Sequence, residues 1–167
     1  MARVGYLAPQ PGWEGIHAQT MQELAERARV TLLGPPLQAP LNEAEYRRVV
    51  AKMARSRADA LFVSDYGENF THRKIIAELA AEHKMPTIHP YQGFVDVGGL
   101  MEYAIDFGDL YREVAALVTR VVKGESPAHI PFRQATKFAL RLNATAAKKI
   151  NVEFPPSLLL RADEVIE

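Results

Sequence analysis

Polar and aromatic side chains gather in three short segments, at residues 9–14, 65–69 and 89–91, and each segment follows a short apolar run. They bring together carboxylate, amide and aromatic groups, in Gln10, Trp13, Glu14, Asp65, Tyr66, Glu68, Asn69, His89 and Tyr91. A carboxylate can pair with an ammonium group, and an aromatic ring can cover a flat or apolar group. The mixture is therefore typical of a site for a small polar or zwitterionic molecule.

Distinct roles within such a site follow from the residue types. We expect Trp13 and Tyr91 to stack on the ligand and Asp65 and Glu14 to pair with a cationic group. Asn69 is expected to supply hydrogen bonds. The full set of predicted ligand contacts is Gln10, Trp13, Glu14, Asp65, Tyr66, Asn69, His89 and Tyr91.

Other kinds of chemistry find little support in the sequence. Residues 8–15 contain neither G-x-G-x-x-G nor a Walker pattern, and their prolines lack the N–H groups that a phosphate cradle would use. The five histidines show no metal-ligand spacing, and the chain has no cysteine. Asp65 and Glu68 could form a general acid/base pair, but no nucleophile accompanies them. We expect no catalytic residue, no metal and no cofactor.

The elements that must position these segments are four short apolar runs, at residues 4–8, 30–33, 60–64 and 87–89. The runs lack polar alternation, which is typical of strands buried on both faces of a parallel sheet. They predict an α/β fold with a doubly wound parallel sheet, a Rossmann-like lobe. In such a sheet, ligands bind beyond the carboxyl ends of the strands, which is where the three polar segments lie.

Helical spacing of apolar residues links these runs. One predicted helix buries Tyr46, Val49, Val50 and Met53 and begins at an Asn42/Glu45 capping pair. A second buries Ile75, Ile76, Leu79 and Ala80 and is expected to start at a cap formed by Asn69 or Thr71. A third, less regular, carries Ile16, Met21, Leu24 and Ala28.

The character of the chain changes near residue 97, so we expect two parts: a ligand-binding lobe at 1–97 and a C-terminal extension at 98–167. The extension is predicted to run from a strand to a long helix and then through a strand to shorter helices. Their expected positions are 100–105 (strand), 107–122 (helix capped by Asp106 or Asp109), 138–142 (strand), 144–149 (helix capped by Asn143) and 158–166 (helix). The aromatic residues Tyr103, Phe107 and Tyr111 of this part could line a groove or belong to the core, and we expect them in the core.

Composition excludes several classes of protein. The 20 Lys+Arg residues balance 20 Asp+Glu residues, so the chain has no basic field for binding nucleic acid. No apolar run reaches the roughly 18 residues that a membrane span requires. Prolines interrupt the first apolar stretch too early for a signal peptide, so we expect a cytoplasmic protein if Met1 is the genuine start.

Longer motifs carry a resemblance to a known family. The sequence resembles the tryptophan/tyrosine-type substrate-binding proteins of ABC transporters. The matching segments are G-G-L-M-E-Y at 98–103, D-L-Y-R at 109–112, K-G-E-S-P at 123–127, Q-A-T-K-F at 134–138 (with alanine where the family has proline) and P-P-S-L-L-L-R-A-D-E-V-I-E at 155–167. These motifs are long and in the same order, and the similarity covers nearly the whole chain.

The resemblance implies a fold and a function. Members of this family belong to the type I periplasmic binding proteins, and two Rossmann-like lobes joined by hinge strands close on a ligand. The chain resembles their C-terminal half, with residues 1–97 as the second lobe and residues 98–167 crossing the hinge. It thus implies an amino-acid-like small-molecule ligand, an ABC transporter permease as partner and a periplasmic location.

Two other interpretations remain open. The chain could be a truncated remnant that serves as an oligomeric interaction domain without a transport function. It could also be an enzyme of flavodoxin-like or racemase-like architecture, although no acid/base pair supports this. Because the first lobe is absent, the helix at 107–122 and the strand at 138–142 lack packing partners, and an apolar face of this kind is an association surface. We therefore expect a homo-oligomer.

Overall fold

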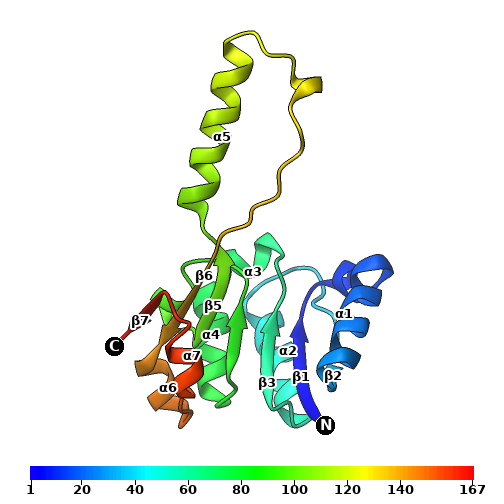
Figure 1. Cartoon of the computed structure of the whole chain (residues 1–167). Helices are drawn as coiled ribbons and strands as arrows, with labels where there is room; N and C mark the ends of the chain where they lie inside the picture. The colour runs from blue at the N-terminus through cyan, green and yellow to red at the C-terminus, as the bar shows by residue number, and fades with distance from the viewer.

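Parallel strands in a seven-stranded sheet form the first half of the molecule. The computed structural model describes residues 1–167, and its sheet has the order β2-β1-β3-β4-β5-β6-β7 (Figure 1). The first four strands are β1 (Ala2–Leu7), β2 (Val30–Leu33), β3 (Ala60–Val63) and β4 (Thr87–His89), all mutually parallel. The structure confirms the predicted α/β class and its four apolar strands.

Helices alternate with these strands, as the spacing of apolar residues predicts. They are the short η1 (Gln10–Trp13), then α1 (Gly15–Ala28), α2 (Glu43–Arg55), α3 (Gly67–Thr71) and α4 (Arg73–Glu82). Helices α2 and α4 contact one another and share a core with the sheet, and α1 lies against β2.

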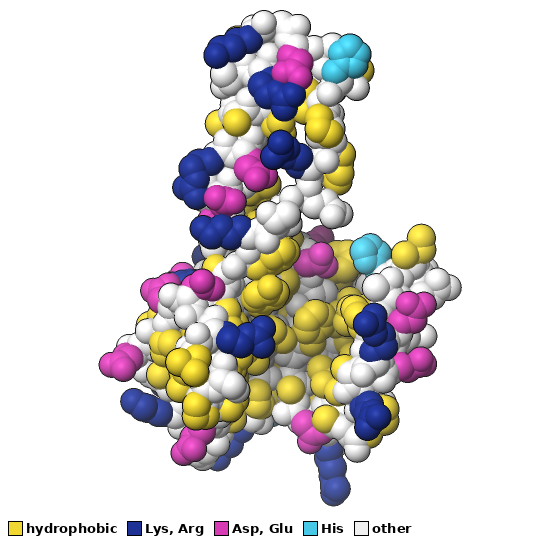
Figure 2. Space-filling view, viewed as in Figure 1, with side chains coloured by type: hydrophobic (Ala, Val, Ile, Leu, Met, Phe, Trp, Pro, Cys, Tyr) yellow, Lys and Arg dark blue, Asp and Glu magenta, His cyan; other side chains and the backbone are white.

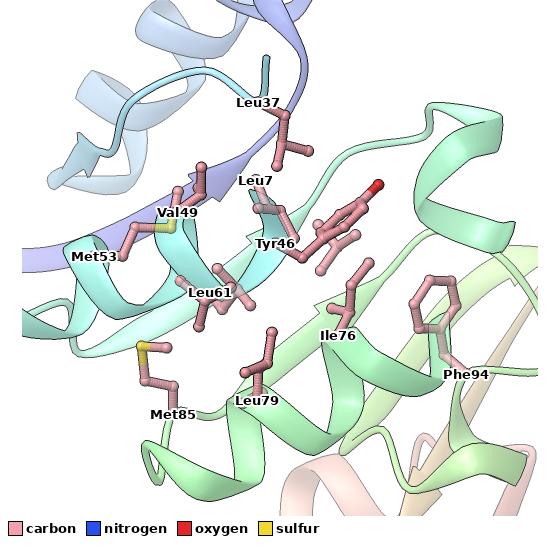
Figure 3. Close-up of a cluster of buried hydrophobic side chains, with 13 residues drawn as sticks. Leu7, Leu37, Tyr46, Val49, Met53, Leu61, Ile76, Leu79, Met85 and Phe94 are labelled. Carbon is pink, nitrogen blue, oxygen red and sulfur yellow. The ribbon is translucent and has the colours of Figure 1, made fainter. Parts of the chain in front are cut away.

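The main core lies between the sheet and the pair α2 and α4 (Figure 3). The predicted apolar face of α2 is fully buried there, and it packs with side chains of β1, β3 and α4, among them Leu7, Leu61 and Ile76. Burying each large aliphatic side chain of this kind stabilises the fold by roughly 1.5–3 kcal/mol. The Asn42 side chain accepts a hydrogen bond from the Glu45 amide at 3.1 Å, which confirms the expected helix cap.

The start of α4 differs from the prediction. Asn69 and Thr71 lie inside α3, and the residue that precedes α4 is His72. The Thr71 hydroxyl donates back to the Gly67 carbonyl, so it bonds within its own helical turn. Neither residue caps α4, because a separate turn of helix occupies the expected cap position.

The C-terminal half continues the same sheet. After η2 (Val95–Val97), strand β5 (Met101–Ile105) pairs in parallel with β4, β6 (Phe138–Asn143) pairs antiparallel with β5, and β7 (Glu164–Ile166) pairs in parallel with β6. Helix α6 (Ala144–Ile150) packs beside α4, and its cap at Asn143 is as predicted. The sheet is thus continuous across residue 97. The segment that projects away from the sheet is the one between β5 and β6.

The last predicted helix, over residues 158–166, is wrong. Helix α7 (Pro156–Leu159) is a single short helix, and the chain then forms β7. Hydrogen bonds with β6 fix this strand, since the Asp163 amide donates to the Leu140 carbonyl at 2.8 Å. In return, the Leu140 amide donates to the Asp163 carboxylate at 2.8 Å.

Helix α5 (Phe107–Val122) projects away from the sheet and returns through an irregular segment with one short turn, η3 (Pro127–His129) (Figure 1). Its bounds and the Asp106 cap are as predicted. None of its residues is buried. The expectation that Tyr103 and Tyr111 are core residues is wrong, because they are 52% and 67% exposed.

No helix of the chain combines the length and the apolar character that crossing a membrane demands.

A buried ion pair ties β5 to β6. Glu102 is fully buried and accepts hydrogen bonds from the Phe94 and Val95 amides at 2.9 and 3.0 Å. Arg141 donates to it at 2.7 Å and also contacts Asp96 and Glu164, whose carboxylates raise the pKa of the guanidinium. The pair therefore anchors the segment after β4 to the antiparallel edge of the sheet.

Removing Arg141 tests this anchor. Arg141→Ala leaves the Glu102 carboxylate buried without its cation, so we expect the free energy of unfolding to fall by about 3–5 kcal/mol in urea denaturation. The control is Arg48→Ala, which breaks an ion pair of a more exposed arginine with Glu45 and should cost about 0–1 kcal/mol. Equal losses in the two variants would contradict the anchoring role.

Candidate ligand-binding site

The carboxyl ends of β1, β3, β4 and β5 meet at one edge of the sheet, because the four strands are parallel neighbours. Element η1 follows β1 directly, and α3 follows β3 after a short turn. The segment after β4 leads to η2, and α5 starts after β5. Ligands of open parallel sheets bind at this edge, so the topology brings the predicted polar segments to one side of the molecule.

A shallow hollow of about 360 Å³ opens at this edge beside the first turn of α5. Gly67, Phe70, Tyr91, Gln92 and Phe107 line it. The Phe70 and Tyr91 rings meet edge to face with their centroids 5.8 Å apart, which is a favourable aromatic geometry. The hollow thus offers aromatic surface with an amide at its border.

Negative charge lies next to these rings. The Tyr91 hydroxyl donates to the Asp65 backbone carbonyl at 2.5 Å, so the exposed Asp65 carboxylate stays free to bind another group. Burial, followed by the carboxylates of Asp65 and Glu68, raises the pKa of Tyr91. Burial, then Tyr66 and Asp65, raises the pKa of Tyr6 to about 12. Both tyrosines are therefore neutral donors beside a carboxylate that can pair with a cation.

A positive group lies beside one of these rings, that of Phe70. The Arg73 guanidinium lies 4.5 Å from the centre of the Phe70 ring and donates to the Phe70 carbonyl at 3.1 Å. The edge thus presents both signs of charge next to aromatic surface. That combination suits a zwitterion with an apolar part.

Trp13 lies in a different hollow. Its ring packs against Tyr6 with centroids 5.3 Å apart, and both residues border a cavity of about 330 Å³ beneath α1. The indole N–H is buried without a hydrogen-bond partner. Gln10 and Glu14 are exposed and hydrogen-bond to each other. The structure therefore separates the predicted stacking residues Trp13 and Tyr91 into two cavities.

Asn69 and His89 support the site from within. Asn69 is fully buried, accepts from the Tyr46 hydroxyl at 3.0 Å, and donates to the carbonyls of Leu7 and Ser64. It thereby holds the ends of β1 and β3 together. A ligand in either hollow would not reach this side chain without a rearrangement.

His89 is 1% exposed and stacks on Phe94 with ring centroids 4.0 Å apart. Its Nε2 atom lies 2.9 Å from the Thr87 hydroxyl. Burial lowers the pKa of His89 to about 3. The imidazole is therefore neutral at ordinary pH and part of the core.

Of the five residues that line the hollow, the predicted ligand contacts include only Tyr91; Gly67, Phe70 and Gln92 were missed, and Phe107 had been expected in the core rather than in a groove. Phe70 and Gln92 each follow the last residue of a segment that was singled out. Phe107 follows β5, whose carboxyl end reaches the same edge, so the rule that located the other segments could have found it. No group of three or more histidine or carboxylate side chains is placed to hold a metal ion.

Comparisons with known proteins identify the family of the chain. Residues 17–166 match the family described as ABC transporter substrate binding protein. The search of curated proteins found no match.

Solved structures share the fold. A conserved domain protein from Vibrio cholerae aligns with a TM-score of 0.81 and 18% identity over 98% of this chain and 54% of its own. An ABC domain from Streptococcus pneumonia in complex with L-Trp aligns with a TM-score of 0.78 and 24% identity, over 99% of this chain and 56% of its own. A substrate-binding protein with adhesive properties from Clostridium difficile, in its ligand-free, open structure, aligns with a TM-score of 0.70 and 16% identity. The alignment covers 99% of this chain and 54% of its own. The chain spans about half the length of these structures.

The burial of His89 predicts a pH dependence. The pKa of His89 is about 3 in the folded state and near 6.5 in the unfolded state, so below pH 6.5 the unfolded state binds more protons. Stability therefore falls as pH drops from 6.5 toward 3. Between pH 6.5 and 5 this residue alone should account for about 2 kcal/mol.

Urea denaturation at several pH values measures this effect. We expect His89→Leu to lose about 2 kcal/mol less than the wild type between pH 6.5 and 5. The control is His129→Leu at an exposed position, which should follow the wild type. Identical pH dependence of the wild type and His89→Leu would contradict the buried, neutral imidazole.

Proposed function

The chain belongs to the ABC transporter substrate-binding protein family, and on that premise we propose that its carboxyl edge binds an amino-acid-like molecule with an aromatic or apolar side chain. The family is one of binding proteins rather than enzymes. A permease of an ABC importer is the partner that this proposal implies. The function is thus recognition and delivery of a small molecule.

One observation carries the proposal, namely the exposed Asp65 carboxylate, which lies near enough to Tyr91 to raise its pKa, while the Tyr91 ring meets that of Phe70 edge to face. The ligand's ammonium group would pair with Asp65, and its side chain would pack on the two rings. Arg73 is the cation available for the ligand's carboxylate. The Streptococcus pneumonia neighbour, which was crystallised with L-Trp, supports the choice of a ligand of this type.

The geometry also bounds the affinity. The hollow is open, and its lining comes from the strand-end segments and the first residue of α5. Small-molecule sites usually bury most of the ligand surface, so a site that covers one side only should bind weakly. We therefore expect dissociation constants in the upper micromolar to millimolar range for this chain, on the order of 0.1–1 mM.

A thermal-shift screen against the twenty common amino acids tests the proposal. A ligand that binds only the folded state should stabilise it by roughly 2.7 kcal/mol at about 100 times its Kd. We expect L-Trp or another large apolar amino acid to raise Tm. The probe that isolates the ammonium contact is indole-3-propionate, which lacks that group and should give a smaller shift.

Matched variants locate the site. Asp65→Asn should remove most of the response to L-Trp and leave any response to indole-3-propionate unchanged, since only the ammonium contact is lost. Tyr91→Ala should weaken the response to both. The control is Glu153→Gln, which neutralises an exposed carboxylate far along the chain and should respond like the wild type. A flat response to all amino acids, or an unchanged response in Asp65→Asn, would refute the proposal.

A second function, that of an oligomeric interaction domain, is favoured by a separate observation. Helix α5 has sixteen residues and none is buried. A helix of this length is marginal on its own in water and depends on packing for its stability. Association with a second molecule would supply this packing.

A further inference from the structure

One face of the sheet carries a long apolar groove. Figure 2 shows hydrophobic side chains gathered over the middle of the sheet, between α1 and the C-terminal elements. The groove has a volume of about 340 Å³, and twelve of its fourteen lining residues are hydrophobic. Residues of β1, β3, β4 and β5 form its floor, and Met21 and Leu24 of α1 form one wall.

Strand register explains why the floor is continuous. Phe62 of β3 is paired with Ile88 of β4, and Ile88 is paired with Met101 of β5. Paired residues point to the same face of a sheet, so the three side chains form a row across the strands. All three are only partly buried. The row is therefore apolar surface that the chain leaves open to solvent.

The width of the groove fits one helix. Strands lie about 4.8 Å apart and packed helices about 8–10 Å apart, so a helix covers roughly two strands. Helix α1 packs against β2, and no helix of the chain lies over the middle of this face. Parallel sheets are covered on both faces in folded proteins, so the uncovered strands lack one helix.

Helix α5 has the complementary surface. Its apolar residues recur at helical spacing along one side, and Val114, Val118 and Val121 are each 40% or more exposed. The opposite side carries Arg112 and the small residue Ala116, and both are exposed. It is therefore an amphipathic helix whose apolar side has no partner in its own chain.

The chain's own α5 is held away from the groove. The Asp106 amide donates to the Lys137 carbonyl at 3.0 Å, and the two side chains form an ion pair at 2.9 Å. Both ends of the projecting segment are thereby fixed where β5 meets β6. Folding α5 back over the sheet would break this junction and the Asp106 cap.

We propose that the occupant of the groove is α5 of a second copy of this chain, and that the exchange is reciprocal. Each copy then covers the open sheet face of the other, and both unpartnered apolar surfaces are buried at once. A sixteen-residue helix is about 24 Å long. Two such helices in two grooves bury on the order of 1,000 Å² in total, which reaches the lower limit for a specific interface.

Light scattering after gel filtration tests the dimer. We expect twice the 18.6 kDa chain mass at micromolar concentration. Val118→Lys places a charge on the apolar side of α5 at a site already 55% exposed, so it should weaken the dimer about 10-fold or more without unfolding the chain. The matched control is Ala116→Lys on the opposite side of the same helix, which should remain dimeric. A monomeric wild type would overturn the proposal.

Disulfide trapping tests which surfaces meet. The chain has no cysteine, so single cysteines report one contact each. Mixing Val118→Cys chains with Met101→Cys chains under mild oxidation should give the mixed disulfide between two copies. The control is a mixture of Ala116→Cys chains with Met101→Cys chains, which should form little of the mixed disulfide.

Other occupants would give other results. If α5 pairs with α5, Val118→Cys alone should form disulfide dimers in preference to the mixed product, which would overturn the proposal. If a different polypeptide segment or a small molecule normally fills the groove, the purified chain should be monomeric and no mixed disulfide should form. The residues tested are separate from Asp65 and Tyr91, so failure of the dimer and failure of ligand binding are distinguishable.

Discussion

A parallel sheet must be covered on both faces, because its strands are apolar on both sides. In this protein α2 and α4 meet the requirement on one face, where Tyr46, Met53 and Ile76 are fully buried. Helix α6 extends the same layer beside α4. On the other face α1 leaves the middle of the sheet open. The open groove is the consequence of this unmet requirement, and the projecting α5 adds a second apolar surface that is exposed.

The same sheet produces the candidate site. Parallel pairing brings four strand ends to one edge, and buried polar groups then fix the segments that follow them. Asn69 holds the ends of β1 and β3 together, and the pair of Glu102 and Arg141 holds the segment after β4. Because these buried groups provide the rigidity, exposed residues such as Asp65 are free to contact a ligand. Polar residues near the edge thus divide into those that build it and those that face solvent.

Much of this architecture could be predicted from the sequence. Apolar runs located the strands, and helical spacing with a cap at Asn42, Asp106 or Asn143 located three of the helices. These features are local, because propensity, capping and periodicity act within a few residues.

Features that depend on distant partners could not be predicted. Strand β7 has only three residues and exists through its pairing with β6, so its sequence was misread as helix. Tyr103 and Tyr111 were expected in the core, because a pattern of apolar residues shows that a surface needs a partner but not whether the same chain provides it. Asn69 and His89 were assigned to the ligand because residue type and loop position do not reveal burial. The hollow at Tyr91 could not be predicted without knowing the register of β4 and β5.

Amide hydrogen exchange at several protein concentrations tests most directly the claim that the lobe is complete on one face and incomplete on the other. The account predicts slow exchange in β1, β3, α2 and α4 at every concentration, since their core is contained in one chain. It predicts that amides of α5 are protected only as concentration rises, because their packing comes from a second copy. Strong protection of α5 that does not change on dilution would contradict the account, as would weak protection of α2 and α4.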